Sequence, residues 1–297
     1  MLLFSGNSHP MLANELAKAL QIPLRQATIS KFADGETNVE IKTTAVRNNI
    51  AVILQTTCQP VNDHLIELLL LADALKNARA RKIIAIIPYL GYMRQDYLHK
   101  NGAALSSYVI ANMLNHSGID HLITLDAHSQ QITKMFTLPI INIPSTNVFA
   151  ADIRARSWHN PIFVAPDLGA INRATAMAKI FNTDVTLIIK KRLATQNIQM
   201  RHLSNSVTNR DCIIIDDVID TGNTIEKAAS CLIQKGARQI YVYATHAVLS
   251  NNAKQNLLGS ACNEIIVSNS IPQKISCDKI RYVSLAELLV AQLHTIA

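Results

Sequence analysis

Short apolar runs recur along the chain, and each ends at a cluster of polar residues, glycine or proline. An amphipathic stretch of helical period follows most of these runs. Such an alternation of strand and helix is typical of α/β proteins with mostly parallel sheets flanked by helices. The runs that predict buried strands are Ile50–Gln55, Lys82–Ile87, His121–Leu125, Ile162–Ala165, Val185–Ile189, Cys212–Ile215, Gln239–Ala244 and Glu264–Val267.

The amphipathic stretches predict helices, and a pause in the pattern predicts a domain boundary. The clearest helical patterns are Asp63–Ala78, Ser106–Asn115, Ala170–Phe181 and Thr224–Gly236. Gly236 stands where a C-terminal cap is expected. The rhythm pauses near Pro144, which divides the chain into residues 1–143 and 144–284, with 285–297 as a closing helix.

Composition supports two domains and narrows the class of partner. At roughly 150 residues per domain, 297 residues suggest two domains, and 49% hydrophobic with 16% charged residues excludes a disordered chain. The net charge of +7 favours a polyanionic partner, either a nucleic acid or a small phosphorylated molecule. A nucleic acid is disfavoured, because the longest basic run is Lys190-Lys191-Arg192 and only 5% of residues are aromatic.

The cysteines and the apolar segments predict a cytoplasmic protein without a membrane partner. Five cysteines are present, an odd number, and no C-x-x-C pair occurs, so neither a disulfide framework nor a zinc site is indicated. The first residues lack a basic export signal, and Glu67 and Asp73 interrupt the most apolar helical stretch.

The segment Cys212-Ile-Ile-Ile-Asp-Asp-Val-Ile-Asp-Thr-Gly-Asn-Thr224 holds the clearest chemistry. An apolar strand is expected to deliver Asp216 and Asp217 to its carboxyl end, where open α/β sheets bind ligands. Backbone N–H groups and hydroxyls of the following loop suit a phosphate at a helix N-terminus. Acids beside a phosphate loop suggest a ribose 5-phosphate whose diol they hold; the alternative is an acidic cap on an ordinary helix. The loop residues are Asp220, Thr221, Gly222, Asn223 and Thr224.

This segment resembles the phosphoribosyl-diphosphate signature of type I phosphoribosyltransferases and of ribose-phosphate pyrophosphokinases. The remaining motifs are similar to the second family over nearly the whole chain. They are Phe32-Ala-Asp-Gly-Glu36, Ile87-Pro-Tyr-Leu-Gly-Tyr-Met-Arg-Gln-Asp96, Leu125-Asp-Ala-His128, Ala165-Pro-Asp-Leu-Gly169, Lys190-Lys-Arg192 and Tyr243-Ala-Thr-His246. The resemblance implies two phosphoribosyltransferase-like domains, ATP-side and sugar-side. It also implies conversion of ATP and ribose 5-phosphate to phosphoribosyl diphosphate and AMP for nucleotide biosynthesis, with Mg²⁺ required.

The resemblance also implies how ATP is held, since neither G-x-x-x-x-G-K-[ST] nor G-x-G-x-x-G is present. Arg94, Gln95 and Asp96 would bind ATP. An adenine-side loop of Phe32, Asp34, Gly35 and Glu36 would come from a neighbouring subunit, which implies a homo-oligomer built from dimers. Taken locally, the loop is also compatible with an ordinary turn, and Arg94 with a solvated surface residue.

Magnesium and catalytic residues follow from the same resemblance. His128 and Asp167 would bind Mg²⁺ or order the triphosphate, although a histidine at a strand end is often structural. Lys190 and Arg192, with His128, would be catalytic; the pair would lie on a mobile loop, and residues 193–210, without a strong core pattern, would form a lid. The other interpretation of the basic triplet is a solvated strand edge.

The chain departs from the family pattern near these motifs, and two other functions compete with the leading one. Tyr97 and Ile189 replace a usual basic and a usual acidic residue, and Ala127, Ser129 and Gln130 vary around the D-x-H motif. These changes leave allosteric control by phosphate or ADP open. The alternatives are a regulatory subunit that binds an active homologue, and a phosphoribosyltransferase, for which no nucleobase motif is visible.

Overall fold

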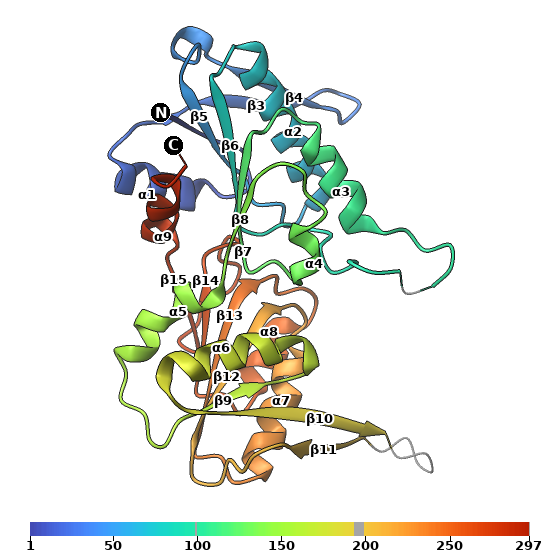
Figure 1. Ribbon diagram of the computed structural model, residues 1–297, viewed down its shortest axis with the longest axis vertical. Helices are drawn as coiled ribbons and strands as arrows, with labels where there is room; N and C mark the ends of the chain where they lie inside the picture. Colours follow the sequence, from blue (N-terminus) through green and yellow to red (C-terminus); the bar gives the residue numbers. More distant parts are fainter. Residues whose placement is uncertain (99, 193–198, 297) are drawn as a thin grey trace. The chain divides into compact units, whose positions relative to one another are not determined.

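The computed structural model describes residues 1–98, 100–192 and 199–296, which form two compact α/β units (Figure 1). The chain passes between the units more than once, because short segments from the second half belong to the first unit. The first unit contains Met1–Pro144, Ser270–Pro272 and Ser284–Ala297, and the second contains Ser145–Asn269 and Gln273–Val283.

A parallel sheet forms the centre of the first unit, with α1 (Pro10–Leu20), α2 (Val61–Asn77) and α3 (Ser106–Asn115) around it. In spatial order its strands are β2 (Leu24–Arg25), β1 (Leu2–Ser5), β5 (Ile50–Leu54), β6 (Lys82–Ile87), β7 (His121–Leu125) and β8 (Ile140–Ile143). An antiparallel hairpin of β3 (Ala27–Lys31) and β4 (Thr37–Ile41) packs against α2. The closing helix α9 (Ala286–Leu293) packs against α1.

The second unit has a larger sheet that is parallel except at one edge. Its strands follow the order β11 (Gln199–Leu203), β10 (Asp184–Arg192), β9 (Ile162–Ala165), β12 (Asp211–Ile219), β13 (Gln239–Ala247), β14 (Glu264–Ser268) and β15 (Ile280–Val283). Only the β10–β11 pair is antiparallel among the strand pairs that the structure describes in this sheet. The helices of the unit are α5 (Ser145–Arg154), α6 (Ile171–Phe181), α7 (Asn223–Gln234) and α8 (Ala253–Gly259).

The α/β fold class expected from the apolar runs is confirmed. Every predicted strand is present, because residues of these runs are buried between helical layers on both faces of a sheet. Gly236 adopts φ +82° directly after α7, and its N–H and that of Ala237 satisfy carbonyls of the last helical turn. No helix among the described residues is long and apolar enough to cross a lipid bilayer.

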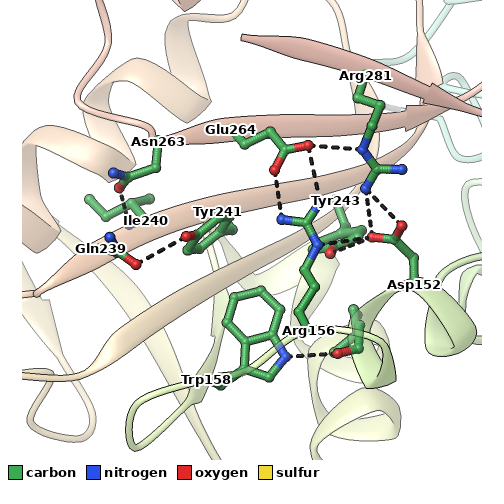
Figure 2. A network of polar contacts seen from close by, with 11 residues as sticks. Asp152, Arg156, Trp158, Gln239, Ile240, Tyr241, Tyr243, Asn263, Glu264 and Arg281 are labelled. Carbon is green, nitrogen blue, oxygen red and sulfur yellow. Dashed lines mark hydrogen bonds and ion pairs between the residues drawn. The ribbon is translucent and has the colours of Figure 1, made fainter. Parts of the chain in front are cut away.

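A network of ion pairs joins α5 to the strands β13–β15 of the second unit (Figure 2). Arg281 Nη2 lies 2.7 Å from Asp152 Oδ2, and its Nε lies 2.9 Å from Glu264 Oε1. Arg156 donates two hydrogen bonds to Glu264, at 2.6 and 3.0 Å. The fully buried Tyr243 donates its hydroxyl to Asp152 at 2.8 Å. The end of α5 is therefore fixed by charged side chains on β14 and β15, by Arg156 just after the helix, and by the neutral hydroxyl of Tyr243 on β13.

This network predicts loss of stability in acid. The hydrogen bond from Arg156 is the main cause that lowers the pKa of Glu264. Burial acts to raise the pKa of Asp152, but Arg281, Tyr243 and the charge of Arg156 outweigh burial and lower it. Because both pKa values are lower when folded, the stabilisation is present above the unfolded values near pH 4 and is lost as the pH falls through the folded ones.

We expect Glu264→Gln to lower the free energy of unfolding by about 1–2 kcal/mol at pH 7, a modest loss because these pairs are only partly buried. The loss should be smaller at pH 3, because the carboxylate is then closer to being protonated. Urea unfolding between pH 7 and pH 3 measures the difference. Glu287→Gln, at an exposed position on α9, is the control. An equal loss at both pH values would contradict the electrostatic explanation.

Candidate active site

The loop Asp220–Thr224 connects β12 to the N-terminus of α7 in the second unit. Gly222 precedes the helix with φ +76°, a conformation that glycine adopts without strain, and the first helical residues Asn223 and Thr224 are exposed. The unpaired N–H groups of the first helical turn and the positive end of the helix dipole make this loop suitable for a phosphate. Its assignment to the 5-phosphate of the sugar stays a prediction.

Two residues that the sequence analysis missed hold this loop in place. Ser250 donates its hydroxyl to the carboxylate of Asp220 and its backbone N–H to the Asp220 carbonyl at 3.1 Å. Asn256, on α8, donates to the Thr221 carbonyl at 2.8 Å and to Asn223 Oδ1 at 2.9 Å. These contacts join residues about thirty positions apart, so no local sequence pattern indicates them.

The acid pair lies within β12 and not at its end, which corrects the sequence-based expectation. The strand continues to Ile219 because Val218 and Ile219 pair with β13. Asp216 and Asp217 are consequently buried, at 8% and 6% exposure. Both still belong to the strand that leads directly into the phosphate loop.

Arg173, from α6, is a further residue of this site that the sequence analysis missed. Its Nη2 lies 3.2 Å from Asp217 Oδ2, and its Nη1 donates to the Gly169 carbonyl at 3.3 Å. The Asp217 backbone N–H donates to Asp216 Oδ1 at 2.9 Å. The guanidinium thus compensates one carboxylate of the pair and connects it to the loop that contains Gly169.

Burial is the main cause that raises the pKa of Asp216, and the charges of Asp217 and Asp167 raise it further, while Arg173 acts against them. The pair therefore binds a proton more readily than two isolated carboxylates. A proton on the pair would reduce its repulsion of an anion at the neighbouring loop.

Asp167 follows β9, the strand next to β12, and the register of the two strands places it level with the acid pair. Its Oδ1 accepts a hydrogen bond from the Ala170 N–H at 3.2 Å and caps the short helical turn Leu168–Ala170. A partly exposed carboxylate at this position is a suitable oxygen ligand for Mg²⁺, which usually takes one or two carboxylates and keeps most of its water.

His128 belongs to the first unit and lies just after β7. The turn is fixed by Asp126, which adopts φ +41° and donates its N–H to the Ile143 carbonyl at 2.8 Å, and by the Ala127 N–H, which donates to Asn142 Oδ1 at 2.9 Å. His128 is exposed. Its imidazole is a less typical Mg²⁺ ligand than a carboxylate and is better suited to contact phosphate oxygens. In the described part of the chain, no three His, Cys, Asp or Glu side chains group as a metal site.

The predicted ATP residues of the first unit occupy two places. Arg94, Gln95 and Asp96 follow β6 in a loop, with Arg94 and Gln95 exposed and Asp96 buried. The Ser107 hydroxyl donates to the Gln95 carbonyl at 2.8 Å, so the start of α3 holds this loop. Ser106 donates to the Gln95 side chain.

The residues Phe32, Asp34, Gly35 and Glu36 form the tip of the β3–β4 hairpin. Phe32 and Glu36 close the turn with a 2.8 Å backbone hydrogen bond, Gly35 adopts φ +92°, and Asp34 Oδ1 accepts from the Glu36 N–H at 3.1 Å. Phe32 is 56% exposed. An aromatic ring at the exposed tip of a hairpin is available to stack on a flat ligand, as the proposed adenine contact requires.

The predicted catalytic pair lies at the end of β10. Lys190 and Arg192 belong to the strand β10 and not to a loop, which corrects the expectation of a loop, while their extended backbone is as expected for the K-x-R pair. Their side chains lie outside what the structure describes, as do residues 193–198 of the proposed lid. Within residues 193–210 of the proposed lid, Gln199–Leu203 forms β11 and pairs with β10. β11 lies at the edge of the sheet and has a mostly polar sequence, so it gives no apolar run that would predict a strand.

Comparisons with known proteins agree over nearly the whole length of the chain. Residues 1–118 match a model described as the N-terminal domain of ribose phosphate pyrophosphokinase, and residues 183–297 match the phosphoribosyl synthetase-associated domain. The ribose-phosphate pyrophosphokinase of Burkholderia pseudomallei is 42% identical, over 97% of this chain and 92% of its own. The chain belongs to the ribose-phosphate pyrophosphokinase family.

Other members of the ribose-phosphate pyrophosphokinase family give the same picture. The relative from Haemophilus ducreyi is 40% identical over 99% of this chain and 95% of its own length. The crystal structure of phosphoribosylpyrophosphate synthetase from Mycobacterium smegmatis, 31% identical, aligns with a TM-score of 0.92 over 99% of this chain and 98% of that one. The two units are accordingly phosphoribosyltransferase-like domains, as predicted.

Proposed function

We propose that the protein is a magnesium-dependent ribose-phosphate diphosphokinase, which transfers the diphosphoryl group of ATP to the C1 hydroxyl of ribose 5-phosphate. The products are phosphoribosyl diphosphate and AMP, and the phosphoribosyl diphosphate supplies nucleotide biosynthesis. The observation that supports this most is the arrangement in the second unit, where a buried acid pair leads directly into a loop at a helix N-terminus. An acid pair and an anion site only a few residues apart fit a sugar diol and its phosphate.

In this proposal the chain's own residues position the reactants and stabilise charge. The loop Asp220–Thr224 binds the 5-phosphate, and Asp216 with Asp217 holds the ribose hydroxyls. Arg94 and Gln95 orient the triphosphate so that the C1 hydroxyl faces the β-phosphorus. Lys190 and Arg192 oppose the negative charge that grows on phosphate oxygens, and His128 contacts the same group. Mg²⁺, held through Asp167 when bound, would neutralise phosphate charge.

The test is formation of AMP by the purified chain in the presence of ATP, Mg²⁺ and ribose 5-phosphate, compared with the same reaction without the sugar. AMP that depends on the sugar, together with phosphoribosyl diphosphate in equal amount, supports the proposal. A chain that binds both substrates but forms no AMP would instead be a regulatory subunit. The cytoplasmic location and the lack of nucleic-acid and membrane partners stay predictions.

We further propose that each active site is shared between subunits, with the Phe32–Glu36 tip covering the adenine of a neighbour. Glu36→Ala and Lys190→Ala chains would each be nearly inactive alone. Random pairing of equal amounts makes about half the dimers mixed, so roughly a quarter of all sites would be undamaged. Co-expression of the two variants should therefore restore about a quarter of wild-type activity.

The control is co-expression of a Lys190→Ala chain with an Arg192→Ala chain. Both changes damage the same half of the site, so mixing these two chains should restore no activity. Native mass spectrometry establishes that mixed dimers are present. Mixed dimers without recovered activity would place the Phe32–Glu36 tip in its own subunit's site or outside any site.

A further inference from the structure

A short segment from the second half of the chain is buried inside the first unit. After β14 the chain leaves the second unit at Asn269, contributes Ser270–Pro272 to the first, and returns at Gln273. Ser270 and Ile271 have 0% exposure. Asn269 donates its N–H to the Val283 carbonyl at 2.9 Å, so the residue before Ser270 is still attached to the end of β15. At this crossing the chain thus passes from the second unit to the first within the one peptide link between Asn269 and Ser270.

Thr56, which follows β5 and has 0% exposure, forms a side-chain hydrogen bond with this segment. Its hydroxyl donates to the Ser270 carbonyl at 2.9 Å and accepts from the Tyr89 N–H at 3.1 Å. The Tyr89 carbonyl, 3.3 Å from the Thr56 hydroxyl, is the more distant of its two possible acceptors. This carbonyl already accepts the N–H of Thr57 at 2.9 Å. Since a hydroxyl has one proton, we assign it to Ser270.

Tyr89 begins the loop that contains the proposed ATP residues. The neighbouring Thr57 accepts from the Gly91 N–H at 2.6 Å and donates to the Tyr89 carbonyl at 3.1 Å. A Cβ on Gly91 would lie 2.7 Å from the Thr57 carbonyl, so the loop packs directly on this backbone. Thr56 and Thr57 therefore both hold the start of the ATP loop, and the Thr56 hydroxyl also donates to the 270–272 segment.

We propose that Thr56 is a positioning residue that couples the two substrate sites, by linking the ATP loop to the segment that continues into the sugar-binding unit. This inference rests on the proposed function. β14 pairs with β13, and β13 pairs with β12, the strand that precedes the Asp220–Thr224 loop. In this proposal, a displacement of β14 on binding of ribose 5-phosphate reaches Ser270 through the chain, and the Thr56 hydroxyl transmits it to Tyr89. By linkage, each substrate then changes the affinity of the other by the same factor.

The experiment measures this coupling by calorimetry with a non-hydrolysable ATP analogue, in Mg²⁺, with and without saturating ribose 5-phosphate. We expect the sugar to change the analogue's Kd by about 5-fold or more in the wild-type chain. Thr56→Val, which keeps the volume and removes the hydroxyl, should reduce that factor to less than about 2-fold, and Thr56→Ser should retain it.

Thr57→Val is the matched control. It loosens the ATP loop without touching Ser270, so it should weaken analogue binding while preserving the coupling factor. If Thr56→Val does not fold, Thr56→Ala replaces it, because alanine also lacks the hydroxyl and adds no polar group of its own. Wild-type coupling in Thr56→Val or Thr56→Ala, or its equal loss in Thr57→Val, would overturn the inference.

The result also separates this inference from the proposed function. A wild-type chain that binds both ligands independently would overturn the coupling and leave the proposed function standing. A wild-type chain that binds neither ligand would overturn the proposed function, and the coupling with it.

Discussion

Lys190→Ala is expected to lower kcat by about 100-fold or more, while KM for ribose 5-phosphate changes far less. A cation that engages mainly as charge develops on the transferred phosphates contributes to the transition state and little to binding of the ground state. Steady-state measurement of AMP formation over a range of sugar concentrations separates kcat from KM.

The intervening Lys191 is the matched control for this substitution, since it lies on the same strand β10 between the two proposed catalytic residues. Lys191→Ala removes the same charge from the same segment and should leave kcat within about 3-fold of wild type. A Lys190→Ala variant whose whole defect lay in KM would show that Lys190 binds the sugar and is not catalytic.

Gly222→Ala is expected to weaken ribose 5-phosphate binding by about 10-fold or more and to leave the affinity for an ATP analogue nearly unchanged. Its φ of +76° disfavours any Cβ, and the new atom would lie 3.0 Å from Leu257 Cγ, so the loop must shift. A shift disturbs the N–H groups that are proposed to surround the phosphate. Calorimetry with each ligand separately measures both affinities.

The other end of the same helix provides the control. Gly236→Ala introduces a Cβ at φ +82°, but its nearest neighbour, on Thr208, lies 3.5 Å away. Both variants should lose about 1 kcal/mol of stability from backbone strain, and only Gly222→Ala should lose the sugar. Equal affinity in the two variants would mean that the 220–224 loop does not bind the 5-phosphate.

The sequence predicted those parts of the fold that are encoded locally. The residues 83–87 and Cys212–Ile215 are apolar throughout because both faces of a central parallel strand are buried. Edge strands escaped this test. β11 is mostly polar, and β3 and β4 are half exposed, so none of these three strands gives a continuous apolar run.

The same distinction applies to the candidate site. The loop Asp220–Thr224 could be recognised because its residues are consecutive, and the resemblance located Asp167 by its motif. Arg173, Ser250 and Asn256 could not be found, because each acts through a contact with a residue distant in the sequence. The depth of Asp216 within β12 also depended on pairing with β13, which no local pattern reveals.

The repeated passage of the chain between the two units has a consequence for how the protein is made. On the ribosome, residues 1–144 emerge first, yet their unit also needs Ser270–Pro272 and the helix α9, which packs on α1. The first unit therefore stays incomplete until residues 284–296 have been synthesised, whereas most of the second unit is already available. Contacts of such long sequence separation are slow to form, so the N-terminal half depends longest on protection from aggregation during synthesis.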